Sequence, residues 1–552
     1  MASVASKKIL GASLGNCVHV AGILNFLKLA EHYGYETLFL GPAVSLERLS
    51  ETIREYDPHL IALSYRLTPE VLEKLLSSFK EDVEKSRWQD KVLVFGGTPP
   101  TAEIARKTGL FDAVFSSLEP LEQIISFLKG KIEEEKKDII PPQALTERIE
   151  FNAPFPLLRH HFGQPTVENT IKGAKKIALS QTLDIISIGP DQNAQESFFR
   201  PDEMKKGQDG AGGVPLRKAA DLEAIYKTTR CGNYPLLRCY SGTRDLIQWA
   251  EMSFQTINIA WGAIPLFWYN QLDGRSNRTL MESITENQKA MKWYAGNEIP
   301  LEVNESHQWA LRDAPDTVAA ATAFLAAYNA KKAGITHYVA QYMFNTPSHT
   351  SPLMDLAKMM AKIELIESLH DKNFISIRQM RTGLASLSPD PDVAKGQLSS
   401  SCLFQMALEP KIIHVVGFCE GDHAATPKDV IESAKIAQGV IKSFFLGSPQ
   451  MLNDPKLRDR KEVLVKEAKY LLQAIKDLSS EKGEDPWTDP KTLSQAVQTG
   501  LLDAPHLAGR PHAAGKIVTR IVDGACCAVD PQTGNSMSEK ERISRILNLD
   551  YS

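Results

Sequence analysis

The sequence predicts an α/β protein in two parts: an open, doubly wound parallel sheet followed by a (β/α)8 barrel with a C-terminal extension. Short apolar runs alternate with amphipathic helical segments through the first 130 residues, and the alternation returns at longer spacing between residues 150 and 450. A charged segment that ends in Pro141-Pro142 separates them, as is typical of connectors. We therefore expect a first domain at 1–132, a linker at 133–150, a barrel at 151–450, and a C-terminal helical extension with a barrel-associated tail at 451–552.

The composition is that of a globular protein without a bias toward nucleic acid or membrane. Its 552 residues include 63 basic and 67 acidic side chains, whereas nucleic-acid binders usually carry a basic excess. No run of about 18 apolar residues is present, and the N-terminus lacks the apolar core of a signal peptide. The seven cysteines are scattered without a CxxC pair. We expect a cytoplasmic protein with reduced thiols that binds neither nucleic acid nor membrane.

Five strand–helix units make up the first domain. The spacing predicts helices at about 22–33, 46–56, 69–86, 101–109 and 119–129. The predicted strands are Lys8–Leu14, Glu36–Leu40, Leu60–Tyr65, Lys91–Phe95 and Ala113–Ser116. In such a parallel sheet, ligands bind outside the carboxyl ends of the strands.

Three of these strand ends carry residues suited to binding a bulky ligand. Paired glycines at 96 and 97 let a ligand approach the backbone closely, and Ser64 can donate a hydrogen bond to a buried ring nitrogen. His19, on the first loop, is a candidate metal ligand. The alternative interpretation is a flavodoxin-like domain with a surface histidine.

The spacing of these residues carries a family resemblance. Cys17-x-His19-x-x-Gly22 is followed by a gap of 41 residues, Ser64-x-Arg66, a gap of 29 residues, and Gly96-Gly97. This resembles the flavodoxin-like cobalamin (B12)-binding domain of mutases and methyltransferases, whose pattern is DxHxxG, SxL and GG. The resemblance implies that His19 binds cobalt below the corrin and that the nucleotide tail enters a slot. The implied cofactor-binding residues are Cys17, His19, Val20, Gly22, Ser64, Arg66, Leu67, Gly96, Gly97 and Thr98.

Two positions depart from that pattern. Cys17 replaces the aspartate that orients the histidine, and a neutral thiol is a weaker acceptor. We expect His19 still to bind cobalt, but the strength of this bond on the lower face of the corrin should differ. Arg66 stands at the leucine position, with Leu67 one residue later.

The second part predicts a barrel of about eight strands. Seven are expected at Asp184–Ile188, Leu236–Tyr240, Thr256–Trp261, Ile299–Asn304, His337–Tyr342, Phe374–Gln379 and Ile412–Gly417, and an eighth before residue 180 or in the C-terminal part. Polar and aromatic residues follow the strands, which favours a polar pocket there. The glycine-rich loop Gly207–Pro215 is expected over the barrel mouth, and residues 511–530 predict a terminal strand pair.

The barrel also resembles the large subunit of glutamate mutase (methylaspartate mutase). The similar segments are residues 235–257, 279–291 and 489–509, collinear but weak per residue. The resemblance implies an adenosylcobalamin-dependent isomerase that rearranges a small-molecule substrate through a radical. As partners we expect a second copy of the chain, in a homodimer, and a B12-loading or reactivating chaperone.

Residues at the strand ends indicate how much charge the substrate carries. Glutamate mutase holds the two carboxylates of its substrate with arginines, and the corresponding positions hold Asp191 and Tyr240 here. The position of the glutamate that binds the amino group of its substrate holds Trp261. We therefore expect a less charged substrate than glutamate. His307 or Glu305 could move a proton. The candidates that position the substrate are Tyr240, Asn304, Glu305, His307, Gln341, Arg378 and Glu420.

Three other functions stay open. The chain could be a cobalamin carrier or sensor whose barrel has lost its substrate site, or a corrinoid protein of methyl transfer. An aminomutase that also uses pyridoxal phosphate is the third, although no clear lysine-bearing loop is seen.

Overall fold

The computed structural model describes residues 7–86, 88, 90–116, 118–119, 121–128, 140–240, 244–479 and 485–547. Internal contacts divide the chain into two units. The first comprises 1–139 with 442–448, and the second comprises 140–441 with 449–552. Within the described ranges, no helix has both the length and the apolar character of a membrane span.

The first unit is a five-stranded parallel sheet in the order β2-β1-β3-β4-β5, which confirms the predicted doubly wound, flavodoxin-like fold. Its strands are β1 (Lys8–Leu14), β2 (Glu36–Val44), β3 (Leu60–Tyr65), β4 (Val92–Gly97) and β5 (Ala113–Ser116). Its helices are α1 (Ala21–His32), α2 (Leu46–Tyr56), α3 (Pro69–Ser86), α4 (Pro99–Thr108) and α5 (Leu121–Leu128).

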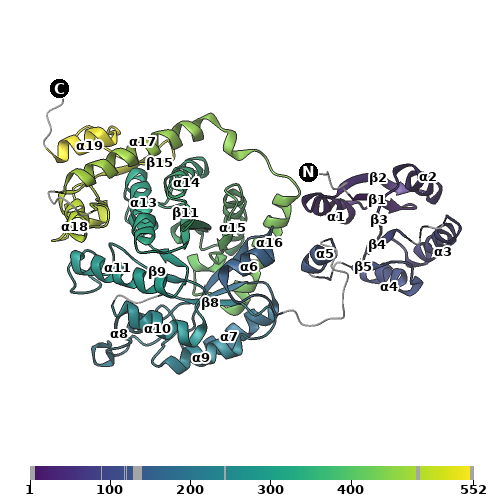
Figure 1. Ribbon diagram of the computed structural model, residues 1–552, viewed down its shortest axis with the longest axis horizontal. Helices are drawn as coiled ribbons and strands as arrows, with labels where there is room; N and C mark the ends of the chain where they lie inside the picture. Colours follow the sequence, from purple (N-terminus) through teal and green to yellow (C-terminus); the bar gives the residue numbers. More distant parts are fainter. Residues whose placement is uncertain are drawn as a thin grey trace. The chain divides into compact units, whose positions relative to one another are not determined.

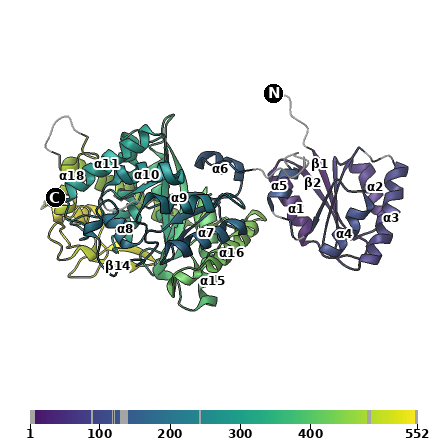
Figure 2. The same ribbon diagram turned by 90° about the horizontal axis from the view of Figure 1, so that it is seen from below.

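Two apolar cores hold these helices on opposite faces of the sheet. α1 and α5 cover one face, and α2, α3 and α4 cover the other (Figure 2). The strand order reverses at β1, which pairs with β2 on one side and β3 on the other. Such a reversal leaves a crevice at the carboxyl ends of the strands, so the loops after β1, β3 and β4 meet at one edge.

The second unit contains an eight-stranded parallel sheet in the order β8-β7-β6-β13-β12-β11-β10-β9, a nearly closed barrel as predicted. The edge strands meet where the amide of Ala260 donates to the carbonyl of Leu237, at 2.9 Å. The strands are β6 (Leu157–Phe162), β7 (Ile185–Ile188), β8 (Leu236–Cys239), β9 (Gly262–Ile264), β10 (Leu301–Val303), β11 (His337–Phe344), β12 (Ile375–Thr382) and β13 (Ile412–His414).

One predicted strand is wrong, and the eighth strand is now placed. Residues Thr256–Trp261 do not form a strand, because α10 (Leu246–Ile257) continues into them and ends at Asn258, whose φ is +46°. The strand begins only at Gly262. The eighth strand is β6, which lies before residue 180 and pairs with both β7 and β13.

Helices surround this barrel (Figure 1). Those that follow the strands are α7 (Val167–Ser180), α8 (Gln192–Ser197), α9 (Ala219–Thr228), α10, α11 (Leu280–Gly296), α12 (Ser306–Ala310), α13 (Asp316–Lys332), α14 (Pro352–Glu367), α15 (Pro391–Met406) and α16 (Pro427–Phe445). The C-terminal part adds α17 (Pro455–Asp477), α18 (Pro490–Thr499), a hairpin of β14 (Thr519–Val522) and β15 (Ala525–Ala528), and α19 (Glu539–Ile546).

The C-terminal part is fastened to the barrel by a buried charge network. α17 packs along α13 and α14 (Figure 1). Lys358 on α14 lies 3.0 Å from Asp355 and 3.2 Å from Asp316 of α13, and Arg460 on α17 lies 3.2 Å from Asp316. Each cation is thus paired, as buried charges must be.

The amino-terminal end of the barrel is closed by α6 (Leu145–Asn152). Leu145 packs against the apolar inner layer of the strands, which includes Leu157, Ile185 and Ile412. Arg148 is buried and donates to backbone carbonyls, including that of Tyr234 at 2.9 Å. The bottom of the barrel is therefore packed, and space remains only toward the other end.

Candidate functional site

The loop after β1 places Cys17 and His19 at the edge of the first sheet. Cys17 is buried, and its Sγ lies 3.8 Å from Nδ1 of His19. The His19 side chain is exposed. With Nδ1 turned toward the thiol, Nε2 is the nitrogen that remains for a metal.

Beside this loop, the edge of the sheet offers space and a buried polar group. The Ser64 hydroxyl is buried and has no hydrogen-bond partner among the described residues. A Cβ added at Gly22 or Gly96 would meet nothing within 4 Å, so both glycines border open space. At Gly97 a Cβ would lie 2.8 Å from the Tyr65 carbonyl, so that position requires glycine.

The other four expected residues lie on the same three loops. Val20 and Leu67 are half-buried, and Arg66 is exposed. The Thr98 hydroxyl is hydrogen-bonded to that of Thr101 at 3.1 Å.

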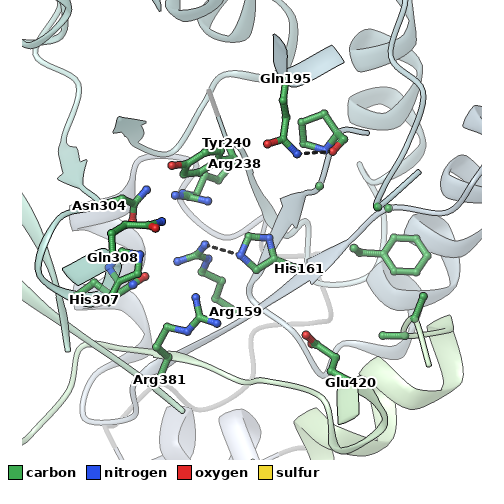
Figure 3. Close-up of a pocket in the computed structure, with 18 of the residues that line it drawn as sticks. Arg159, His161, Gln195, Arg238, Tyr240, Asn304, His307, Gln308, Arg381 and Glu420 are labelled. Atoms are coloured by element: carbon green, nitrogen blue, oxygen red, sulfur yellow. Dashed lines mark hydrogen bonds between the residues drawn. The ribbon is translucent and has the colours of Figure 1, made fainter. Parts of the chain in front are cut away.

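In the second unit, a cavity of about 670 Å³ opens at the carboxyl ends of the barrel strands (Figure 3). The guanidinium groups of Arg159, Arg238 and Arg381 turn into it from β6, β8 and β12. The positions compared with the arginines of glutamate mutase hold Asp191 and Tyr240, and these three arginines bring positive charge to the cavity from other positions. An arginine side chain is long enough to reach the pocket from within a strand, below its last residue.

A polar layer forms the floor of this cavity, where a barrel is ordinarily filled with branched apolar side chains. Arg159 donates to Ser187 and to Gln379, both at 2.6 Å. Glu302 lies 3.2 Å from Arg238 and 3.7 Å from Arg159, and it accepts from the Trp261 indole at 2.8 Å. One carboxylate thus serves two guanidinium groups.

Several donors around the cavity have no partner among the described residues. They are Nε and Nη1 of Arg238, Nδ2 of Asn304 and Nε2 of Gln341, all buried. A buried donor without an acceptor costs about 1–3 kcal/mol, and more when the group is charged. Convergent donors with an excess of positive charge suit an anion with several oxygens, such as a carboxylate.

The electrostatics of the cavity follow from burial and from the arginines. Burial lowers the pKa of Arg381 to about 10, although Glu420 opposes this. Burial alone would raise the pKa of Glu302, but Arg238 and Arg159 outweigh it and lower that pKa. Burial and nearby guanidinium groups hold the pKa of His161 well below its ordinary value. The imidazole beside the arginines is therefore neutral.

A pair of tyrosines forms one wall of the cavity. The Tyr240 and Tyr269 hydroxyls lie 2.8 Å apart, and Gln308 reaches Tyr269 at 3.4 Å. Burial raises the pKa of Tyr240 well above its ordinary value, so its hydroxyl stays protonated. This wall offers neutral hydrogen-bonding groups.

Glycines form the opposite wall. Gly163 and Gly189 follow β6 and β7, and Gly212 comes from the loop expected over the mouth. Asp191 holds this loop, because it accepts from the Gly210 amide at 2.9 Å and pairs with Arg217 at 2.7 Å. Asp191 is thus bound within the loop and is unavailable to a substrate.

The expected substrate-positioning residues divide into two groups. Tyr240, Asn304, His307, Gln341 and Glu420 line the cavity (Figure 3). Glu305 lies outside the lining, because its carboxylate is buried against the amides of Leu266 and Phe267. Arg378 points to the outside of the barrel, where it pairs with Glu367 at 2.8 Å.

Sequence reasoning missed other lining residues, for which a signal existed. Successive side chains of a strand alternate between the two faces, so Gln379 and Arg381 share the inner face and Arg378 lies outside. The same alternation groups Arg238 with Tyr240. The polar residues expected at the strand ends include Arg238, Arg381, Asp422 and His423. The lining residues absent from the prediction include Arg159, His161, Gln195, Tyr269, Arg275, Glu302 and Gln308.

Comparison with known protein families identifies the first unit. Residues 7–125 match the B12-binding family, described as the B12 binding domain. The chain carries a B12-binding domain. The match covers the sheet whose edge holds Cys17, His19 and Ser64, and the barrel lies outside it.

Solved structures are similar to this chain over part of their length, at low sequence identity. A novel cobalamin-binding protein from Desulfitobacterium hafniense DCB-2 is 22% identical over 20% of this chain and 53% of its own, with a TM-score of 0.19. The cobalamin-dependent S-adenosylmethionine radical enzyme OxsB, with aqua-cobalamin bound, is 9% identical over 80% of this chain and 56% of its own, with a TM-score of 0.18. The chain thus spans a little over half the length of these two proteins. No curated protein matches it.

The residues of the B12-binding domain fit a cobalamin in three respects. His19 offers an exposed imidazole whose second nitrogen is held by Cys17. Gly22 and Gly96 leave room at the sheet edge. The buried Ser64 hydroxyl has no partner among the described residues, and a ring nitrogen of the nucleotide tail would supply one. The departure at Cys17 places a thiol, at 3.8 Å, beside Nδ1 of the histidine.

Proposed function

We propose that the chain is an adenosylcobalamin-dependent carbon-skeleton mutase that acts on a small organic anion in the barrel cavity. The observation that carries the substrate class is the buried cluster of Arg159, Arg238 and Arg381 around Glu302, together with cavity donors that have no partner among the described residues. When bound, adenosylcobalamin supplies a carbon radical by homolysis of its Co–C bond. The earlier expectation of a weakly charged substrate is replaced by a carboxylate.

Within this proposal, the residues of the B12-binding domain hold the cofactor. His19 ligates cobalt through Nε2, and Cys17 orients the ring from Nδ1. Gly22, Ser64, Gly96 and Gly97 line the slot for the nucleotide tail. A homodimer and a B12-loading or reactivating chaperone remain expected partners.

The barrel residues bind and orient the substrate. Arg238, Asn304 and Gln341 offer a carboxylate donors that have no partner in the described part of the chain. The Tyr240 hydroxyl stays protonated and donates, and the neutral His307 imidazole can exchange a proton with a neighbouring polar group. The polar floor holds these groups in fixed positions, so little reorganisation accompanies binding.

The test uses the full chain loaded with adenosylcobalamin under anaerobic conditions in the dark. A panel of small mono- and dicarboxylates, with and without an amino group, is added and cob(II)alamin is followed by absorbance and electron paramagnetic resonance. We expect at least one carboxylate to produce cob(II)alamin and an isomerised product, and Arg238→Met to lose both. Corrinoid binding without any response to the panel would favour the carrier. Absence of corrinoid binding would refute the proposal altogether.

A further inference from the structure

A second cluster of metal-ligating side chains lies in the loop between β13 and α16. Cys419 belongs to the short 3-10 helix Phe418–Gly421, His423 follows it, and Asp429 lies in the first turn of α16. One ligand atom from each of the three lies within 4.8 Å of the others. Cys419 is buried, Asp429 is half-buried and His423 is exposed, so the cluster opens to solvent on the histidine side.

The histidine is held in a manner suited to metal binding. Its Nδ1 lies 2.8 Å from a carboxylate oxygen of Asp422, and its Nε2 lies 3.4 Å from Oδ2 of Asp429. Metal-bound histidines commonly donate their other ring N–H to a carboxylate, which fixes the ring and raises its basicity. Asp422 occupies that position here and leaves Nε2 for a metal.

The aspartate is also fixed in place. Oδ2 of Asp429 accepts from the amide and the hydroxyl of Thr426, at 2.9 Å and 2.6 Å. These bonds cap α16 and account for one oxygen only. Among the described residues, no hydrogen bond goes to Oδ1, which leaves a carboxylate oxygen for a cation.

The set of one sulfur, one nitrogen and one oxygen matches a borderline divalent cation. Zinc takes thiolate at about 2.3 Å and imidazole at about 2.0 Å, so tetrahedral ligands lie roughly 3.5 Å apart. The three ligand atoms lie within 4.8 Å of one another, so side-chain movements of about 1 Å bring them to this spacing. Three protein ligands leave a fourth position for water, as in catalytic zinc sites.

We propose that Cys419, His423 and Asp429 bind a single divalent cation of the zinc class, with Asp422 as the positioning residue of the histidine. The loop residues Gly421 to Ala425 line the barrel cavity. The cation therefore ties this part of the cavity wall to the first turn of α16. The site involves none of the groups assigned to cobalamin, so its test does not depend on the mutase proposal.

The test is metal binding to the full chain, purified without a histidine tag, free of corrinoid and dialysed against a chelator. Zn²⁺ is titrated by calorimetry, and Co²⁺ is used as a probe because thiolate ligation gives an intense near-ultraviolet charge-transfer band. We expect one equivalent of either metal and this band. Cys419→Ser abolishes the band and weakens binding at least 100-fold, and Asp422→Asn weakens it about 10- to 100-fold.

Two variants keep the result interpretable. Cys231→Ser, whose thiol bonds only to the Thr228 carbonyl, should bind both metals as the wild type does. His423→Gln, at an exposed side chain, should lose the metal without loss of fold by circular dichroism. Binding that is equally tight in Cys419→Ser, Co²⁺ bound without the band, or no stoichiometric binding at all would each overturn the site.

Discussion

Arg238 and Glu302 face each other inside the barrel, with Nη2 3.2 Å from Oε2 and neither side chain more than 1% exposed. Glu302 also serves Arg159 at 3.7 Å. Nε and Nη1 of Arg238 have no partner in the described part of the chain. The pair therefore leaves positive charge unbalanced at the floor of the cavity, and a bound anion would neutralise it.

Glu302→Gln should strongly destabilise the barrel. The substitution leaves two buried guanidinium groups without a counter-charge, a change that typically costs about 3–5 kcal/mol in free energy of unfolding. Urea denaturation, monitored by tryptophan fluorescence, measures this free energy of unfolding. The control is Glu367→Gln, which breaks a half-exposed pair with Arg378 and should cost less than about 1 kcal/mol. Equal losses in the two variants would contradict the role of Glu302.

Arg238→Met should weaken binding of a small dicarboxylate. With succinate as the probe, calorimetry should show at least a tenfold rise in Kd, because a charge-assisted donor set is removed. Arg238→Lys should recover only part of the affinity, since an ammonium lacks the planar fork of the guanidinium. Arg378→Met, outside the cavity, should bind as the wild type does. The assignment fails if both methionine variants behave alike.

Cys17→Asp should tighten cobalamin binding. A carboxylate accepts the Nδ1 proton of His19 more strongly than a thiol does, and such partners typically change metal affinity 10–100-fold. We expect Kd for cobalamin to fall about tenfold, together with stronger nitrogen coupling in the paramagnetic resonance of cob(II)alamin. His19→Ala should lose that coupling. An unchanged signal and Kd in Cys17→Asp would disprove the account of this position.

Glu305 should make the stability of the barrel depend on pH. Burial raises its pKa to about 7 from 4.5, so the folded chain holds a proton that the unfolded chain releases between these values. The stabilisation is complete below the unfolded value and is lost as the pH rises through 7, by up to about 3 kcal/mol. Unfolding of wild type and Glu305→Gln at pH 5 and pH 8 measures this, and between these two pH values the wild type should lose up to about 3 kcal/mol relative to the variant. Glu409→Gln, on an exposed turn, should show no such trend.

Gly163 and Gly189 offer a matched pair on the glycine wall. A Cβ on Gly163 would lie 2.3 Å from the Gly189 carbonyl, whereas one on Gly189 would meet nothing within 4 Å. Gly163→Ala should therefore lower the free energy of unfolding by about 1–3 kcal/mol, as overpacking does. Gly189→Ala should leave it within about 0.5 kcal/mol. Thermal melting of the two variants measures these changes in stability. A larger loss in Gly189→Ala than in Gly163→Ala would show that the wall is packed differently.

Much of the fold could be predicted because its pattern is local. Leu46–Tyr56 was expected as a helix and begins where the Ser45 side chain accepts from the Arg48 amide. Leu60–Tyr65 has the bounds predicted for the third strand. The strand pair expected within 511–530 is the hairpin of β14 and β15. Capping, periodicity and turns sufficed for these elements.

The barrel floor could not be predicted in the same way. β6 has the sequence LLRHHF, in which Arg159 and His161 point inward and His160 points outward. A buried polar layer looks like an exposed segment when only hydropathy is considered. The unplaced strand and the missed Arg159 therefore have one cause, which is that the partner of Arg159, Gln379, lies more than 200 residues away along the chain.

The ion pair of Arg238 and Glu302 also spans the junction of β8 and β9, the two edge strands of the barrel sheet. Within the described residues, one backbone hydrogen bond, from Ala260 to Leu237, bridges this edge, where neighbouring strands ordinarily share a ladder. Arg238 on β8 reaches across it to Glu302 on β10. Nε and Nη1 of Arg238 have no partner among the described residues, so an anion can bind there while Nη2 keeps its contact with Glu302. A filled pocket would thus leave this edge of the barrel closed.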